Sequence, residues 1–177
     1  MSPKPWCLSR CWLSFVFMVG NAIAQSAQPI ISYNFGLGLA VRGRSTECVA
    51  LATAAVCGLA VTMAFTFVPD LLVSLFVNPQ SPAARIAIDG FPYFSAGFVF
   101  FVVNIVAVGY FQSVERVVPA TVFSLLRGAV FLIPCFIMLP SLVGIPGVWL
   151  ALSLSEFVTS VVIGLFVVCN GRYCGKV

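Results

Sequence analysis

The sequence predicts an all-α, polytopic membrane protein with about five transmembrane helices. Of its 177 residues, 61% are hydrophobic and 8% are charged, whereas soluble domains carry about 25% charged residues. The mean hydropathy is +1.11, which also excludes a disordered chain. Four stretches contain no charged side chain: 11–41, 48–69, 90–114 and 128–155. Each can hold a membrane-spanning helix of about 20 residues and is too long for a barrel strand of about 9–11 residues.

Turn residues and charges divide these stretches into five predicted transmembrane helices: 12–36, 49–69, 91–113, 119–139 and 147–169. The clearest division lies between the last two, where Pro140, Gly144, Pro146 and Gly147 cluster and indicate a turn. The other predicted links cover 36–44, 78–82 and 114–116, and the last link covers 139–147. Asp70 follows the second helix, and we expect it near the membrane surface.

The N-terminal 24 residues have two interpretations. Lys4 and Arg10, followed by an apolar core over 11–19 and the Ala-Ile-Ala sequence of 22–24, are similar to a secretory signal peptide. The apolar character continues to Ile31, however, which leaves room for a complete transmembrane helix. Both interpretations, signal peptide and first helix, remain open at this point.

The basic residues of the links predict the orientation of the chain, because cytoplasmic loops carry an excess of Lys and Arg. With five crossings, one side collects Arg42, Arg44, Arg116, Arg172 and Lys176, and the other collects Lys4, Arg10 and Arg85. We therefore expect a multi-pass protein of the cell (inner) membrane with a cytoplasmic C-terminus and an external N-terminus. Two bases on an external N-terminus suggest that an upstream span is absent, as in a truncated protein.

Several segments together resemble one transporter family. Residues 28–38, with the sequence QPIISYNFGLG, are followed by Arg42 and resemble the eighth helix of the MATE family (multidrug and toxic compound extrusion). Residues 91–112 resemble its tenth helix, and 125–128 (LLRG) with Pro134 resemble its eleventh. Residues 147–151 (GVWLA), followed by Ser155 and Glu156, resemble its twelfth.

This resemblance implies a partial MATE C-terminal lobe over 12–170, preceded by an unmatched segment, 1–11, and followed by a cytoplasmic tail, 171–177. Family members have two six-helix lobes and export organic, often cationic, compounds in exchange for Na⁺ or H⁺. The N-terminal lobe and the seventh helix have no counterpart in the sequence. Neither has the acid that some members carry in the tenth helix, because no acid lies between Phe91 and Glu115.

Glu156 is the most informative single residue, because it lies inside an apolar predicted span. A carboxylate at the centre of a bilayer costs at least about 2.5 kcal/mol, so it suggests a proton or cation site. Arg127 is its expected partner: the two residues lie about 12 Å and about 14 Å from opposite faces of the membrane at 1.5 Å per residue. The alternatives for Glu156 are a purely structural ion pair or a protonated acid bound to a neighbouring helix. The alternative for Arg127 is that it extends alone to the interface.

Polar residues of two further helices are candidates for a substrate or cation pathway. Asn21, Gln25, Gln28 and Ser32 share one face of the first predicted helix, and Asn34 follows them. Asn104 and Gln112 share a face of the third, where we expect Asn104 to point inward. The alternative is hydrogen bonding between helices, which contributes about 0.6 kcal/mol per bond on average.

The composition favours transport over catalysis. Seven cysteines show no metal-binding spacing, and the sequence has no histidine. No phosphate-binding loop or nucleic-acid-binding pattern is present, so we expect no enzyme activity, no cofactor and no metal site. We expect part of a secondary active multidrug efflux transporter, inactive as an isolated fragment, with the lipid bilayer, an organic cation and a missing lobe or complementary chain as partners. The alternative is a structural or interaction membrane protein that assembles with another chain and does not transport.

Overall fold

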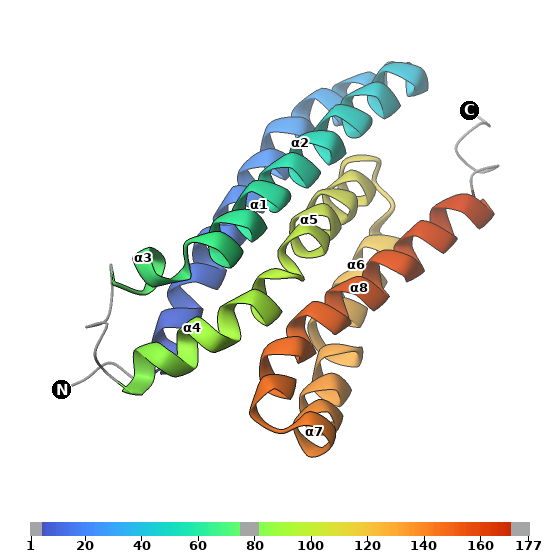
Figure 1. Ribbon diagram of the computed structural model, residues 1–177. Helices are drawn as coiled ribbons and strands as arrows, with labels where there is room; N and C mark the ends of the chain where they lie inside the picture. The colour runs from blue at the N-terminus through green and yellow to red at the C-terminus, as the bar shows by residue number, and fades with distance from the viewer. Residues whose placement is uncertain (1–4, 75–81, 171–177) are drawn as a thin grey trace.

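The computed structural model describes residues 5–74 and 82–170, and these residues form helices and turns without any β-strand (Figure 1). This confirms the predicted all-α class. The helices are α1 (Pro5–Gly36), α2 (Ala40–Phe67), α3 (Pro69–Ser74), α4 (Pro82–Ser95), α5 (Phe98–Ser113), α6 (Val117–Leu125), the π-helical segment η1 (Leu126–Val130), α7 (Leu132–Val143) and α8 (Ile145–Asn170). The ends 1–4 and 171–177 and most of the predicted link 78–82 lie outside the described residues.

Four segments of the described residues are long and apolar enough to cross a membrane: Ala40–Phe67, Gly90–Ser113, Val117–Val143 and Pro146–Cys169. They correspond to the last four of the five predicted spans. The remaining long helix, α1, has 32 residues, which at 1.5 Å per residue is about 48 Å. This helix carries the predicted polar stripe. The polytopic architecture is therefore confirmed.

Several helix boundaries differ from the prediction. α1 begins at Pro5 instead of near 12, and α2 begins at Ala40 instead of at 49. The reason is that the apolar run measures the membrane-buried part of a helix, whereas basic residues such as Arg42 prolong the helix into the aqueous boundary. The link between α1 and α2 is therefore short. Gly38 has a φ of 72°, and the Leu39 amide donates to the Asn34 carbonyl at 2.8 Å.

The turn between α7 and α8 is also tighter than the predicted link 139–147. Gly144 makes the turn with a φ of 76°, a conformation that favours glycine. Pro140 lies inside α7, and the Gly144 amide donates to its carbonyl at 3.0 Å. Pro146 lies in the first turn of α8, where the missing N–H of proline has no helical partner to lose.

The predicted span 91–113 is interrupted where α4 ends at Ser95 and α5 begins at Phe98. The break is stabilised by α8, because the Ser153 hydroxyl donates to the Tyr93 carbonyl at 2.8 Å and approaches the Phe94 carbonyl at 3.2 Å. These carbonyls lie at the end of α4, where helical partners are lost. α8 comes so close that a Cβ on Gly97 would lie 2.6 Å from the Ser153 Cα.

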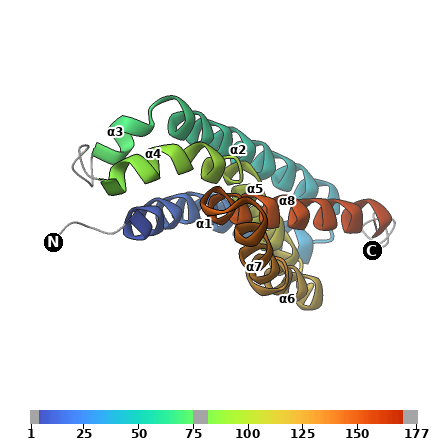
Figure 2. The ribbon, with the colours of Figure 1, turned by 60° about the horizontal axis from the view of Figure 1, so that its bottom comes forward.

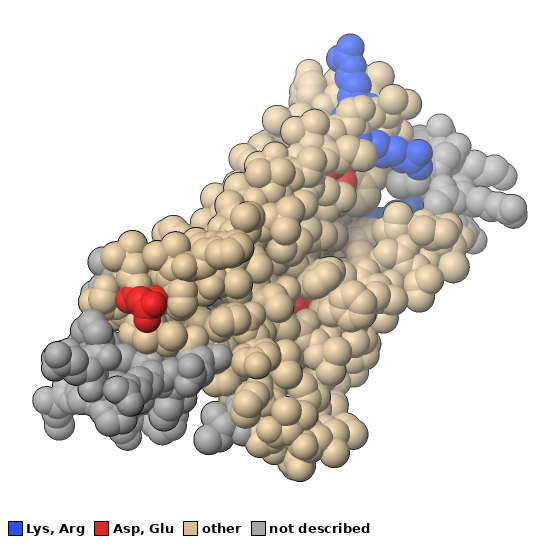
Figure 3. Space-filling view, viewed as in Figure 1, with Lys and Arg blue, Asp and Glu red and all other residues tan. Residues whose placement is uncertain are grey.

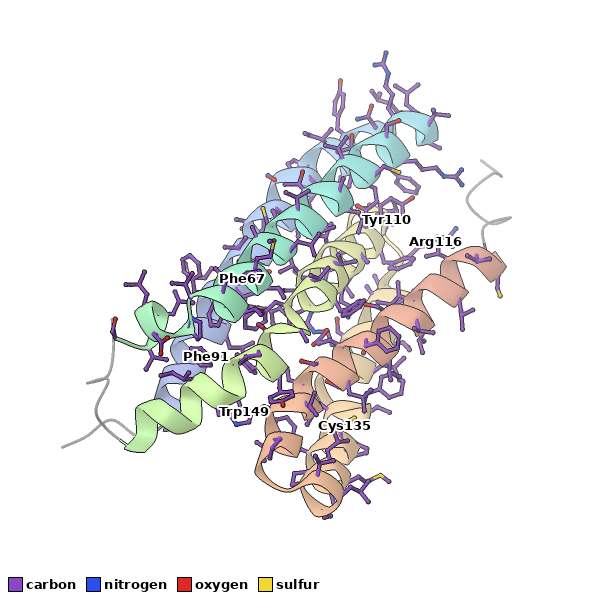
Figure 4. The ribbon with its side chains drawn as sticks, in the orientation of Figure 1. Phe67, Phe91, Tyr110, Arg116, Cys135 and Trp149 are labelled. Carbon is purple, nitrogen blue, oxygen red and sulfur yellow. The ribbon has the colours of Figure 1, made fainter. Side chains whose placement is uncertain are left out.

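α5 is the central helix, with α1 and α2 on one side and α8 on the other (Figures 1 and 2). The core at its N-terminal end is aromatic: the Phe65 ring lies 5.1 Å from the Phe91 ring and 5.2 Å from the Phe98 ring, centroid to centroid. Phe91 also contacts Trp149 where α4 meets α8 (Figure 4). Because α5 is covered on both sides, its polar residues Asn104 and Ser113 are buried, whereas Gln112 near its C-terminal end is exposed.

The segment α6–η1–α7 lies at the periphery and packs mainly against α8 (Figures 1 and 2). Of its most apolar window, only 6% is buried. Figure 3 shows that Lys and Arg side chains gather at the end of the molecule that carries the α1–α2 and α5–α6 links. Arg42, Arg44 and Arg116 belong to these two links and their flanks. The two basic links therefore lie at one end of the helices, as in the predicted topology.

The close contact of α4–α5 with α8 predicts that Gly97→Ala is destabilising. Gly97 has an ordinary φ of −84°, so alanine meets no backbone strain, but its Cβ would clash with Ser153. We expect a loss of about 1–3 kcal/mol, as for other overpacked sites, measured as a lower midpoint of thermal unfolding in detergent. The matched control is Gly164→Ala in α8, where nothing lies within 4 Å of the new Cβ. An equal response of both variants would contradict this packing.

Candidate functional site

The candidate site is a buried polar cluster around Glu156, which is 2% exposed and belongs to α8. The side-chain Nδ2 of Asn104, which belongs to α5, donates to Glu156 Oε2 at 2.8 Å and to the Glu156 backbone carbonyl at 3.0 Å. The Ser160 hydroxyl donates to Asn104 Oδ1 at 2.8 Å. Asn104 itself is 1% exposed, which confirms that it points inward. Both ends of the Asn104 amide are therefore held by residues of α8.

Arg127 completes the cluster from η1. Its Nε lies 3.3 Å from Glu156 Oε1, so the predicted pairing of the two residues is confirmed. Its Cζ lies 4.7 Å from the centroid of the Phe101 ring, in a cation–π contact. The Glu156 side chain is 3% exposed and that of Arg127 is 19% exposed. The arginine therefore lies on the outer side of the pair, between the carboxylate and the surface of the chain.

The helical period explains how the sequence builds this cluster. Glu156 and Ser160 are four residues apart and lie on the same face of α8, toward α5. Ser155 and Thr159 are also buried, and their hydroxyls donate to carbonyls of their own helix, at 2.9 Å to Leu152 and at 2.8 Å to Ser155. The polar groups on this face are thus satisfied, as burial away from water requires.

The π-helical segment η1, which carries Arg127, was not predicted. The Phe131 amide donates to the Leu126 carbonyl at 2.9 Å, a bond across five residues instead of four. Pro134 is the signal in the sequence that accompanies it, because proline has no N–H to donate to the Val130 carbonyl at the end of η1. Such insertions occur often at functional sites, and this one lies beside the charged pair.

The predicted polar residues of α1 and α5 partly meet each other. Gln28 Nε2 donates to Gln112 Oε1 at 3.4 Å, and the Ser32 hydroxyl donates to the Ser113 carbonyl at 3.1 Å. These bonds support the interpretation that the stripe joins two helices. They involve none of the residues that form the Glu156 cluster.

The other predicted polar residues of α1 take no part in the hydrogen bonds between α1 and α5. Asn21 and Asn34 donate to carbonyls of their own helix, at 3.1 Å and 2.8 Å. Gln25 is exposed on the surface of the chain. The polar stripe is therefore divided between contacts with α5 and contacts within α1.

One further acidic residue lies inside a helix and is not among the predicted site residues. Glu47 lies in α2 and is half-buried, and its Oε2 has no hydrogen-bond partner within the described part of the chain. Its signal was present, because it is the only acid within the 28 residues of α2. The prediction treated Glu47 as the boundary of an apolar run, which hid its position inside a helix.

The arrangement around Glu156 can hold one positive charge. A carboxylate with one oxygen held by an amide and the other paired with a guanidinium is electrically neutral as a unit. Removal of the guanidinium would leave an uncompensated buried charge, at a cost of about 3–5 kcal/mol. A cation or a proton would compensate this charge if Arg127 moved away.

Comparison with known proteins gives the family. The MatE family model matches residues 11–138, well over half of the chain. No curated protein matches significantly. Among solved structures, the MATE multidrug transporter DinF-BH in complex with rhodamine 6G is similar, with a TM-score of 0.80, 25% identity, and coverage of 89% of this chain and 35% of that one.

Two further structures show the same fold. A proline-to-alanine mutant of a MATE protein has a TM-score of 0.81 and 19% identity, covering 93% of this chain and 38% of its own. An outward-facing multidrug resistance MATE family transporter of the MOP superfamily has a TM-score of 0.81 and 16% identity. The similarity covers 92% of this chain and 38% of that transporter. The chain thus spans between 35% and 38% of the length of these transporters. The match over 11–138 and the shared helical fold show that this chain belongs to the MATE family of membrane transporters.

Proposed function

We propose that the chain forms part of a secondary active multidrug efflux transporter, which exchanges organic, often cationic, compounds for Na⁺ or H⁺. The observation that carries this proposal is the buried Glu156–Asn104–Arg127 cluster in a chain of MATE fold. Intramembrane charges are rare and mark ion or substrate pathways in transporters. The rhodamine 6G complex of DinF-BH supports a drug-like substrate.

The pathway in this proposal has two polar regions. Glu156, Arg127 and Asn104 exchange the coupling ion, because they combine a carboxylate with a movable positive charge. The second region lines the substrate path along α1 and α5 and consists of Gln25, Gln28, Asn34 and Gln112. Two observations support this region. Gln25 and Gln112 are exposed, and Gln28 links α1 to α5 through its hydrogen bond to Gln112.

The proposed partners are the lipid bilayer, an organic cation and a second lobe. Alternating access requires two lobes that move against each other, and this chain spans only part of the length of its structural relatives. A further lobe, in the same polypeptide or in a complementary chain, therefore completes the pathway. The chain needs no cofactor other than its coupling ion and has no catalytic role.

The first test is transport by the purified 177-residue chain in proteoliposomes. Uptake of rhodamine 6G driven by a Na⁺ or H⁺ gradient should not exceed that of empty liposomes, because a single partial lobe has no second half to move against. Full-length DinF-BH is the positive control. Gradient-driven uptake by the isolated chain, abolished by Glu156→Gln, would contradict the need for a second lobe. If the chain stays inactive even with a MATE N-terminal lobe supplied, the alternative of a non-transporting interaction protein is favoured.

The second test concerns orientation in the cell membrane. We propose a cytoplasmic C-terminus, because the α1–α2 and α5–α6 links, with Arg42, Arg44 and Arg116, lie at the same end as the end of α8. A fluorescent protein fused to the C-terminus should be fluorescent in bacterial cells, and an alkaline phosphatase fusion at the same position should be inactive. The reverse pattern would show that the basic end faces the exterior.

A further inference from the structure

We propose that Glu156, Asn104 and Phe101 form a binding site for a guanidinium-sized monovalent cation, and that the side chain of Arg127 occupies this site as a tethered competitor. The proposal deepens the proposed function and rests on it, since it names where a cation exchanges and what holds the site closed. The test measures binding, so its outcome does not depend on transport.

The composition of the site suits an organic cation. It presents a carboxylate oxygen, Glu156 Oε1, and the face of an aromatic ring, Phe101, to the same group. A carboxylate and an aromatic face together are a general means of recognising organic cations. The occupant is a guanidinium, with Nε 3.3 Å from the carboxylate and Cζ 4.7 Å from the ring centroid. An external cation of the same shape would meet the same two surfaces.

The acceptor, the Glu156 carboxylate, is fixed independently of Arg127. Glu156 Oε2 receives its hydrogen bond from Asn104 at 2.8 Å, and Asn104 is held in turn by the Ser160 hydroxyl. Glu156, Ser160 and Asn104 belong to α8 and α5, which pack directly against each other. The carboxylate therefore stays in place when the arginine leaves, and the cation site persists without it.

Arg127 belongs to the least buried of the four candidate membrane spans. It is carried by η1, within the segment Val117–Val143, of which the most apolar window is only 6% buried. The Arg127 side chain is 19% exposed, against 3% for Glu156. A π-helical turn differs from an α-helical turn by one residue of hydrogen-bond register. A change of that register would rotate Arg127 relative to α8.

The experiment removes the tethered guanidinium and supplies a free one. The Arg127→Ala variant of the full chain, in detergent, is titrated with millimolar methylguanidinium chloride while the midpoint of thermal unfolding is followed. We expect a saturating rise of the midpoint in Arg127→Ala and none in the unmodified chain, whose site is filled. Arg42→Ala, which removes an exposed arginine at the start of α2, is the matched control and should show no rise. NaCl and KCl at equal concentration correct for ionic strength.

Two further variants locate the binding. In the double variant Arg127→Ala/Glu156→Gln, methylguanidinium should no longer raise the midpoint of thermal unfolding, because the carboxylate is gone. In Arg127→Ala/Phe101→Leu the apparent affinity for methylguanidinium should fall by about 2- to 30-fold, the range expected for loss of a cation–π contact. If Arg127→Ala folds only when it is purified with methylguanidinium, that supports the proposal.

Three results would overturn it. The first is an Arg127→Ala variant that neither gains stability from methylguanidinium nor folds in its presence. The second is an equal rise in the Glu156→Gln double variant, since the cation would then bind elsewhere. The third is an equal rise in the Arg42→Ala control. None of these results bears on whether the complete transporter moves drugs, so the binding site and the proposed function fail separately.

Discussion

The burial of one carboxylate constrains the arrangement of three helices. Glu156 is 2% exposed inside a helix that is apolar enough to cross a membrane, where no water is present to solvate it. Its two oxygens are satisfied by Asn104 of α5 and Arg127 of η1. The rotations of α5 and α8 and the position of the peripheral segment are thereby linked, because a turn of any one helix would leave a buried charge without its partner.

The requirement that buried polar groups find partners also explains the break between α4 and α5. Where α4 and α5 are interrupted, the Ser153 hydroxyl of α8 bonds the Tyr93 and Phe94 carbonyls, and the Thr62 hydroxyl of α2 donates to the Ser95 carbonyl at 2.9 Å. Hydroxyl groups of neighbouring helices thus replace helical bonds, as is usual for breaks in membrane helices. The break lies between α4 and α5, and its supporting side chains come from α2 and α8, so it is part of the packing of these four helices.

Much of this architecture could be predicted from residue type and spacing. Apolar runs located the membrane spans, and the depths of Arg127 and Glu156 predicted their pairing, because distance along a helix converts directly into depth. The role of Asn104 as the partner of Glu156 could not be predicted, because it depends on how α5 and α8 are rotated about their axes. The break at Gly97 depends on contacts with α8, which residues distant in sequence provide, and Pro134 accompanies the π-turn of η1 without specifying it. The roles of Gln25 and Asn34 in a pathway stay predictions.

The central claim is that Arg127 and Glu156 act as one unit in holding η1 to α8. The measurement that tests it most directly is a double-mutant cycle of Arg127→Ala and Glu156→Gln on the thermal stability of the chain in detergent. Our account predicts that the double variant loses less stability than the sum of the single variants, by about 0.5–3 kcal/mol, the range for residues in contact. Additive effects would show that the two side chains do not depend on each other, and would contradict it.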